Sequence, residues 1–330
     1  MNYNILGRTG LNVSQLGFGC GNIGGLLVRG DYPTIRQVVS RAIELGINYF
    51  DTAVRYGNGQ SEVNLGAVLR ELRANALIGT KVPLKGEDMS QIGAAITRSV
   101  EGSLRRLGCA TIDLIQLHNR IGSPRQPEQG NDWVGLHDLD AVMRSFEELQ
   151  QQGKVRFWGI TGLGASDALH EAVATYGFKS IQVPYNLLNP SAGTTVPPSF
   201  SFQDYGQLIE LAAQQKMGVI AIRILAGGAL SGTMGRHPVA AKSVNPIASE
   251  QEYSADVDRA RRYNFLVEEG HVSSLVEAAV RFVVSKSGVS TALLGFSSQD
   301  QLEEAVKYVE RGPLSADTLE RIRATWSCPE

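Results

Sequence analysis

Four polar side chains stand where short apolar segments end, and their types could support acid–base chemistry. Asp51 closes the apolar segment 47–51, and Tyr56 follows it by five residues. Lys81 closes segment 76–81, and His118 closes segment 113–118. If these segments are parallel strands of one closed barrel, their carboxyl ends bring the four side chains to one mouth. Taken singly, each residue also has a structural explanation, such as a helix cap, a surface charge or a core side chain.

The four residue types together fit the reduction of a carbonyl group. A free tyrosine has a pKa of about 10, which is too high for easy proton exchange at neutral pH. An ammonium stabilises the phenolate, so Lys81 is expected to lower the pKa of Tyr56, while Asp51 keeps Lys81 protonated. His118 would orient a substrate oxygen, on which negative charge grows during hydride transfer. One histidine and one aspartate are too few to bind a metal.

A recurring order of helix, glycine and short apolar segment predicts where the strands lie. Glycine closes a helix without steric cost because it readily adopts positive φ. Short apolar segments after such stops are typical of strands that are buried on both faces. The glycines in this pattern are Gly46, Gly108, Gly153, Gly177, Gly218 and Gly288.

Helices with one apolar face alternate with these segments over residues 33–310, without a break in composition. This order predicts parallel βα units in one domain spanning residues 1–330. Two more strands, near residues 14–19 and 76–81, bring the number to about eight. The predicted fold class is therefore α/β, a (β/α)8 TIM barrel with an N-terminal β-hairpin and extra helices.

The segments outside the repeating units have expected positions as well. The hairpin is expected to turn at Thr9-Gly10 and to plug one end of the barrel. Long irregular stretches at 119–136 and 231–250 follow the fourth and seventh strands, where a barrel carries its site. Extra helices are expected at 252–268 and within 312–330.

The chain resembles the aldo-keto reductase superfamily at the segments that carry these side chains. Residues 50–62 are similar to the family signature, residues 78–82 resemble its lysine strand, and residues 103–118 resemble its histidine segment. The order and spacing agree from Leu6 to Glu304. The resemblance implies an oxidoreductase in which Tyr56 is the general acid in reduction and the base in oxidation. It also implies that the tetrad consists of Asp51, Tyr56, Lys81 and His118.

The resemblance further implies a nicotinamide cofactor, with NADP as the family default and NAD as the alternative. Segment 225–228 is similar to the loop over the pyrophosphate, and segment 295–304 to the adenosine-end loop and helix. The second segment contains no lysine or arginine, which leaves NAD open. Gly162 stands where the family often has asparagine, and Arg223 follows the position of a stacking aromatic. The expected cofactor-binding residues are Thr161, Gln182, Arg223, Leu225, Gly227, Gly295, Ser297, Gln301 and Glu304.

The expected substrate residues lie beside the tetrad. Residues 19–24 fit the dinucleotide pattern G-x-G-x-x-G, but no helix opens directly after them. We interpret this segment as a loop at the barrel mouth that leaves Asn22 near the substrate. Arg55 and Asn119 complete the set by position. Arg55 would favour a polar, sugar-like or anionic substrate, or it is a loop charge that faces solvent.

Composition excludes several other classes of protein. The formal net charge is −2, so no basic surplus favours nucleic acid or anionic membranes. The sequence lacks an apolar signal core at its start and any apolar run of about 18 residues, so neither secretion nor a membrane span is expected. The scattered Cys20, Cys109 and Cys328 favour a reducing cytoplasm. We expect a small carbonyl or sugar substrate and a monomer or weak homo-oligomer.

Two other functions remain open at this point. Some channel-associated subunits have similar barrels in which catalysis is secondary, so a cofactor-binding regulatory subunit is the first alternative. The intact tetrad argues against it. The second alternative is a cofactor-free Schiff-base aldolase with Lys81 as its nucleophile, which borohydride would trap with its substrate.

Overall fold

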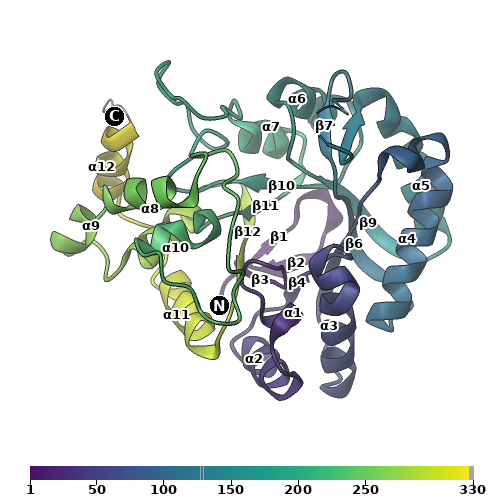
Figure 1. The fold of residues 1–330 in the computed structure, drawn as a ribbon, viewed down its shortest axis with the longest axis horizontal. Helices are drawn as coiled ribbons and strands as arrows, with labels where there is room; N and C mark the ends of the chain where they lie inside the picture. Colours follow the sequence, from purple (N-terminus) through teal and green to yellow (C-terminus); the bar gives the residue numbers. More distant parts are fainter. Residues whose placement is uncertain (127, 129, 327–330) are drawn as a thin grey trace.

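The computed structural model describes residues 1–126, 128 and 130–326, and a closed barrel of eight parallel strands lies at its centre (Figure 1). Around the barrel, each strand pairs with the next in the order given below, and the last pairs with the first. The predicted (β/α)8 TIM barrel is therefore confirmed. The strands are β3 (Leu16–Gly19), β4 (Tyr49–Asp51), β5 (Leu77–Val82), β6 (Ile112–Leu117), β9 (Val155–Thr161), β10 (Ser180–Pro184), β11 (Gly218–Ile222) and β12 (Val289–Gly295).

Helices cover the outside of the barrel and pack on it with one apolar face. In α2, Ile35, Val38 and Val39 form this face, and the Asp31 side chain caps the first turn by accepting from Thr34 N at 2.9 Å. Together with α2, seven further helices in the described part of the chain cover the barrel. They are α2 (Tyr32–Glu44), α3 (Gln60–Glu71), α4 (Ile92–Leu107), α5 (Leu139–Gln151), α6 (Ser166–Thr175), α7 (Leu208–Gln214), α10 (Leu275–Val284) and α11 (Gln299–Glu310).

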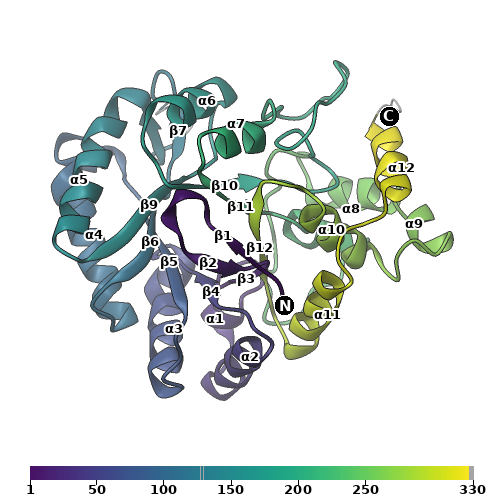
Figure 2. The same cartoon turned by 180° about the vertical axis from the view of Figure 1, so that it is seen from behind.

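The N-terminal hairpin consists of β1 (Tyr3–Ile5) and β2 (Asn12–Ser14), joined through the short helix η1 (Gly7–Thr9). In Figure 2 it lies across the near end of the barrel. Leu6 and Leu11 are buried there against the interior side chains Tyr49 and Leu114. The hairpin thus plugs the amino-terminal end of the barrel, as predicted, and leaves the carboxyl ends of the strands for the site.

Further elements gather at the carboxyl ends of the strands and on one flank. The expected extra helices are confirmed, and α8 and α9 lie beside α12 on one side of the molecule (Figure 1). The stretch after β6 carries a small parallel pair of strands, β7 and β8, which the sequence did not predict. Cys328 lies outside the described residues. These elements are α1 (Leu26–Arg29), η2 (Tyr56–Gly59), η3 (Gly86–Ser90), β7 (Arg120–Gly122), β8 (Trp133–Gly135), η5 (Leu136–Asp138), η6 (Ala226–Ser231), α8 (Tyr253–Arg261), α9 (Phe265–Glu268) and α12 (Ala316–Trp326).

The glycine stops differ from expectation at two of the six positions. Positive φ is found at Gly46, Gly108, Gly153 and Gly288, but not at Gly177 or Gly218. Gly218 is the first residue of β11, and Lys216 makes the left-handed turn before it with φ +55°. A lysine can take this conformation at a modest steric cost, so a search for helix ends at glycines did not find this turn.

Candidate active site

Lys81 connects Asp51 and Tyr56 at the barrel mouth. Its ammonium donates to Asp51 Oδ1, to the Thr52 carbonyl oxygen at 2.9 Å and to the Tyr56 hydroxyl oxygen at 3.4 Å. Asp51 pairs with Gly79 across β4 and β5, and Lys81 lies two residues further, so both side chains point into the barrel. The ion pair is fully buried. Lys81 therefore meets Asp51 and Tyr56, which precede it by 30 and 25 residues, as predicted.

Burial dominates the electrostatics of this group. It raises the pKa of Tyr56 above its usual value, and the Lys81 ammonium offsets this only in part. The expected net lowering of the Tyr56 pKa is therefore wrong, although Lys81 acts in the expected direction. Burial alone lowers the pKa of Lys81, but Asp51 and Tyr56 outweigh it and raise the pKa. At neutral pH the phenol is protonated and the lysine is charged.

His118 faces Tyr56 across the mouth. Their ring centroids lie 6.0 Å apart, with the rings nearly perpendicular. Burial lowers the pKa of His118 well below its usual value, and Lys81 and Arg55 add to this. Among the described residues, the buried Nδ1 of His118 has no hydrogen-bond partner. A neutral imidazole beside a phenol can hold the oxygen of a small substrate.

A buried carboxylate supports the strand that carries Lys81. Glu62 accepts from the Thr80 hydroxyl at 2.6 Å and from Arg106 Nε at 2.6 Å, and it is fully buried. Because neighbouring residues alternate across a strand, holding Thr80 outward keeps Lys81 inward. Glu62 was not predicted as a site residue, and its place in the signature segment was the only signal for it.

Asn22 holds the loop that presents Tyr56. Its side-chain oxygen accepts from Gly57 N at 3.1 Å, and its amide nitrogen donates to the Arg55 carbonyl oxygen at 3.4 Å. The loop turns through positive φ at Gly57 and Asn58. A Cβ on Gly21 would lie 3.4 Å from the Tyr56 ring, so the glycine-rich segment packs against the side chain of Tyr56. The segment is thus a loop at the barrel mouth, as we interpreted it. The sequence did not predict the one-turn helix α1, which begins at Leu26, two residues after the segment.

Arg55 and Asn119 are tied to neighbouring loops. Arg55 pairs with Asp132 at 3.6 Å and is about one-third exposed. The buried Asn119 side chain accepts from Leu84 N at 2.8 Å, and it donates to the carbonyl oxygens of Leu84 at 2.7 Å and Asp132 at 3.0 Å. These contacts make Asn119 a brace between loops. Direct substrate contact by either residue stays a prediction.

Gln182 and Thr161 lie side by side on β10 and β9, where they are direct partners in the register. Gln182 Nε2 donates to Asp51 Oδ2 at 2.6 Å, and the Thr161 hydroxyl donates to the Leu117 carbonyl oxygen at 3.0 Å. Both are buried inside the mouth. An amide group placed there would meet both side chains, while Gln182 already joins the tetrad through Asp51.

The glycine loop after β11 is flanked by two guanidinium groups. Residues 226–231 form η6, which follows Leu225 and in which Gly227 has φ +72°. A Cβ on Gly227 would lie 3.3 Å from Arg223 Nη1, and Arg236 Nη1 donates to the Gly227 carbonyl oxygen at 3.0 Å. Arg236 was not predicted, because its loop has no periodic pattern. Two cations beside a glycine loop favour an anionic ligand.

Segment 295–304 starts a capped helix beside the glycine-rich loop. The Ser297 hydroxyl donates to the Gly24 carbonyl oxygen at 2.6 Å, and Ser297 N donates to Gln301 Oε1 at 2.9 Å. Ser298 caps α11 by accepting from Gln301 N. Gly295 ends β12, and Gln301 and Glu304 are exposed on the first turns of α11. This placement fits the adenosine end of a dinucleotide, and a cofactor role for these residues stays a prediction.

Residues 233–248, here called the strap, run from η6 across to the glycine-rich loop. Arg29 Nε donates to the Val239 carbonyl oxygen at 2.8 Å, and Arg29 Nη2 donates to the Asn22 carbonyl oxygen at 2.5 Å. Ala241 N donates to the Ile23 carbonyl oxygen at 3.0 Å. The strap therefore spans the space between β11 and β3, next to both segments expected to hold the cofactor.

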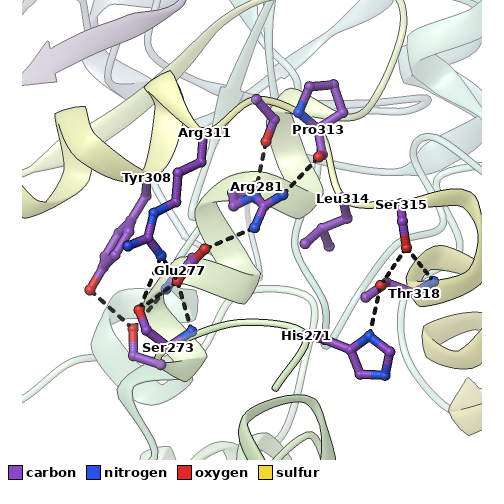
Figure 3. Close-up of polar contacts among 12 residues, drawn as sticks. His271, Ser273, Glu277, Arg281, Tyr308, Arg311, Pro313, Leu314, Ser315 and Thr318 are labelled. Carbon is purple, nitrogen blue, oxygen red and sulfur yellow. Dashed lines mark hydrogen bonds and ion pairs between the residues drawn. The ribbon is translucent and has the colours of Figure 1, made fainter. Parts of the chain in front are cut away.

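A hollow of about 520 Å³ lies elsewhere, beside the start of α10 (Figure 3). Glu277 accepts there from Arg281 at 2.8 Å, from Arg311 at 2.6 Å and from Ser273 N at 2.8 Å. Ser274 caps the helix by accepting from Glu277 N. Both guanidinium groups are paired with Glu277, so this cluster joins α10 to the end of α11.

Within residues 1–126, 128 and 130–326, no three histidine, cysteine, aspartate or glutamate side chains gather as metal ligands would. Over the same residues, no helix combines the length and apolar character needed to span a bilayer.

Comparison with known proteins bears on this site. The profile of the Aldo/keto reductase family matches residues 15–327. The structure of an aldo-keto reductase from Bacillus halodurans in its holo form is 28% identical, covers 98% of this chain and 96% of its own, and has a TM-score of 0.72.

Two relatives differ in their described roles. The L-galactose dehydrogenase of Arabidopsis thaliana is 27% identical, over 97% of this chain and 92% of its own. A putative voltage-gated potassium channel subunit beta of Schizosaccharomyces pombe is 29% identical, over 93% of this chain and 88% of its own. The family profile, the shared barrel and the strand-end residues agree, and the chain belongs to the aldo/keto reductase family of nicotinamide-dependent oxidoreductases.

Proposed function

We propose that the protein reduces a small aldehyde, ketone or sugar, or oxidises the matching alcohol, with Tyr56 exchanging the proton. The observation that carries this proposal is the buried contact of the Lys81 ammonium with both Asp51 and Tyr56. In reduction the Tyr56 hydroxyl donates its proton to the carbonyl oxygen. In oxidation the phenolate takes the proton from the alcohol.

The charges around Tyr56 support the direction of each proton transfer. Its raised pKa keeps the phenol protonated at neutral pH, which suits the donor needed for reduction. As the proton leaves, negative charge forms on the phenol oxygen 3.4 Å from the Lys81 ammonium, which stabilises it. His118 is neutral and donates a hydrogen bond to the same substrate oxygen as charge grows there.

The residues of the mouth fit a nicotinamide dinucleotide. Gln182 and Thr161 would hold the carboxamide, Arg223 and the glycine loop the pyrophosphate, and the Ser297 segment the adenosine end. The bound cofactor supplies the hydride. NADP is the proposed form, and NAD is the alternative because segment 295–304 carries no cation.

Two other functions are weaker candidates. The likeness to the channel subunit of Schizosaccharomyces pombe favours a cofactor-binding regulatory subunit with vestigial activity. The assembled tetrad favours turnover. A Schiff-base aldolase needs a neutral lysine nucleophile, and the raised pKa of Lys81 with its three acceptors opposes that role.

The test combines cofactor binding with turnover. Fluorescence titration with NADPH and NADH shows which cofactor binds and how tightly. Tyr56→Phe is expected to reduce carbonyl turnover by about 100-fold or more while cofactor affinity is kept. Tyr32→Phe, which removes an exposed hydroxyl bonded to Glu71, is the matched control. Near-normal turnover in Tyr56→Phe would show that Tyr56 is not the general acid. Tight cofactor binding without turnover in the wild type would favour the regulatory subunit.

A further inference from the structure

Arg120 is a cation at the mouth that the proposed proton transfer does not use. It follows His118 by two residues and is the first residue of β7. Its guanidinium lies 5.9 Å from the centroid of the Trp133 ring. Over residues 1–126, 128 and 130–326, it has no carboxylate partner and no hydrogen-bond acceptor. A half-buried cation in this state is available to a ligand.

Two further donors beside Arg120 are buried without a partner. The Tyr205 hydroxyl and the Trp133 indole N–H have no hydrogen-bond partner in the described part of the chain. Tyr205 is fully buried, and its backbone N–H and carbonyl oxygen are fixed by Ser191 and His170. The phenol therefore has a set position, and leaving its hydroxyl unpaired costs free energy.

Two guanidinium groups of the mouth act electrostatically on Tyr205. Burial raises the pKa of Tyr205, while Arg120 and Arg223 each lower it. Burial lowers the pKa of Arg223, Tyr56 opposes this, and Arg120 adds to it. Arg223 has a positive φ of 57°. Arg120 and Arg223 thus both act electrostatically on Tyr205, and Arg223 interacts with Tyr56 in the same way.

The carboxylates near Arg120 and Arg223 already have other partners. Asp132 pairs with Arg55 at 3.6 Å on the rim. Asp256 accepts from the Ser249 hydroxyl at 2.7 Å and from Glu250 N at 3.1 Å, and it acts electrostatically on Arg223. Among the described residues, neither carboxylate contacts Arg120. The described surroundings of Arg120 are therefore rich in donors and offer its guanidinium no acceptor.

We propose that the substrate carries an anionic group, a carboxylate or a phosphate, and that Arg120 binds this group with help from Trp133 and Tyr205. The anionic group of the substrate lies over β6 and β10, while the carbonyl carbon of the substrate faces Tyr56. This inference rests on the proposed function and narrows its substrate class. The sequence suggested Arg55 as the residue that favours an anionic substrate, but Asp132 offsets the charge of Arg55. The proposal assigns this selectivity to Arg120 instead.

The test compares matched charged and neutral substrates. Aldehydes of three to six carbons with a terminal carboxylate are assayed beside their methyl esters, using the wild type, Arg120→Met and Arg120→Lys. We expect kcat/KM for the carboxylates to fall by about 10- to 100-fold in Arg120→Met, chiefly through KM. The esters change by less than about threefold, and Arg120→Lys recovers part of the loss because it keeps the charge. Arg156→Gln removes a cation at the opposite end of the barrel, where it pairs with Asp113, and is the control.

Three outcomes overturn the proposal. Equal losses for the carboxylate and its ester mean that Arg120 only supports the fold. Weaker NADPH binding in Arg120→Met assigns the cation to the cofactor phosphates. An uncharged aldose that outperforms every carboxylate and is unaffected by the variant removes the anion from the substrate.

A binding measurement separates this proposal from the proposed function. A saturated dicarboxylate of four to six carbons cannot be reduced, so its calorimetric titration does not depend on turnover. Binding to the wild type that weakens about 10-fold or more in Arg120→Met supports the anion site even if no aldehyde is reduced. Equal heats in both proteins reject the site while carbonyl reduction stands.

Discussion

Gln182 Nε2 lies 2.6 Å from Asp51 Oδ2. A residue that is expected to bind the cofactor therefore also holds the carboxylate of the tetrad. The other oxygen of Asp51 accepts from Lys81, and Tyr49 donates to Oδ2 at 3.2 Å. The two strands involved, β4 and β10, are not neighbours in the barrel. The contact therefore crosses the barrel interior and couples the cofactor side of the mouth to the proton-transfer side.

Gln182→Leu is expected to move the acidic limb of the pH–rate profile to higher pH. Burial raises the pKa of Asp51, and the hydrogen bond from Gln182 opposes this, so its loss raises the pKa further. When Asp51 is protonated, Lys81 loses its charged partner and turnover falls. Steady-state rates over pH check the shift. Gln116→Leu alters another fully buried glutamine with no bond to Asp51 and should leave the limb in place; the same shift in both variants would point to a general effect of burial.

Removal of the lysine charge should raise the pH at which alcohol oxidation begins. Lys81 lowers the pKa of Tyr56, so without it the phenolate forms only at higher pH. Lys81→Met alone leaves the buried Asp51 without a charged partner, which costs about 3–5 kcal/mol of stability. The double variant Asp51→Asn with Lys81→Met removes both charges and keeps the fold measurable, but its shift is smaller because Asp51 raises the pKa of Tyr56. An oxidation profile in Lys81→Met that coincides with the wild type would show that Lys81 does not act on Tyr56.

The meeting of the tetrad was predictable because it depends on topology. Once Asp51, Lys81 and His118 were placed at the ends of parallel strands, closure of the barrel brought them together whatever their side-chain details. The net pKa of Tyr56 was not predictable in the same way. It depends on how far burial outweighs one ammonium, and the sequence does not report the depth of a side chain.

The loops account for most of what the sequence did not reveal. Residues 185–207 form a long connection after β10 that places Tyr205 before α7. Arg29 holds the strap through the Val239 carbonyl oxygen, which lies 210 residues further along the chain. Arg236 supports the strap from within through the Ala241 carbonyl oxygen, and no periodic pattern predicts either contact. Regular residue spacing predicts only helices and strands. The contacts of irregular loops that carry specificity therefore cannot be predicted before the fold is known.

Loss of the Arg29 contacts should speed the release of the cofactor. Arg29 donates to the strap at Val239 and to the glycine-rich loop at Asn22, and Arg29→Met removes both bonds. With the strap freer to open, dissociation of NADPH is expected to rise by about 10-fold, with little change in its association rate. Stopped-flow displacement measures this rate. Arg98→Met, an exposed cation on α4, is the control; an unchanged dissociation rate in Arg29→Met would mean that the strap does not retain the cofactor.

The Glu277 cluster of Figure 3 should make a pH-dependent contribution to stability. Burial alone raises the pKa of Glu277, but the bonds from Ser273 and the two guanidinium groups outweigh it and lower the pKa to about 2. The pKa is about 4.5 when the chain is unfolded. Because the folded value is the lower one, the stabilisation is fully present above about pH 4.5 and is lost as pH falls towards 2.

Glu277→Gln is therefore expected to lower the free energy of unfolding by about 3 kcal/mol at neutral pH, since each pKa unit corresponds to about 1.4 kcal/mol. Urea unfolding at pH 7, 5 and 3 measures the difference from the wild type, which should shrink at the lowest pH as Glu277 itself becomes protonated. Glu320→Gln on the exposed face of α12 should change stability by less than about 0.5 kcal/mol at each pH. A difference between Glu277→Gln and the wild type that stays constant from pH 7 to 3 would show that packing by Glu277, and not its charge, joins α10 to α11.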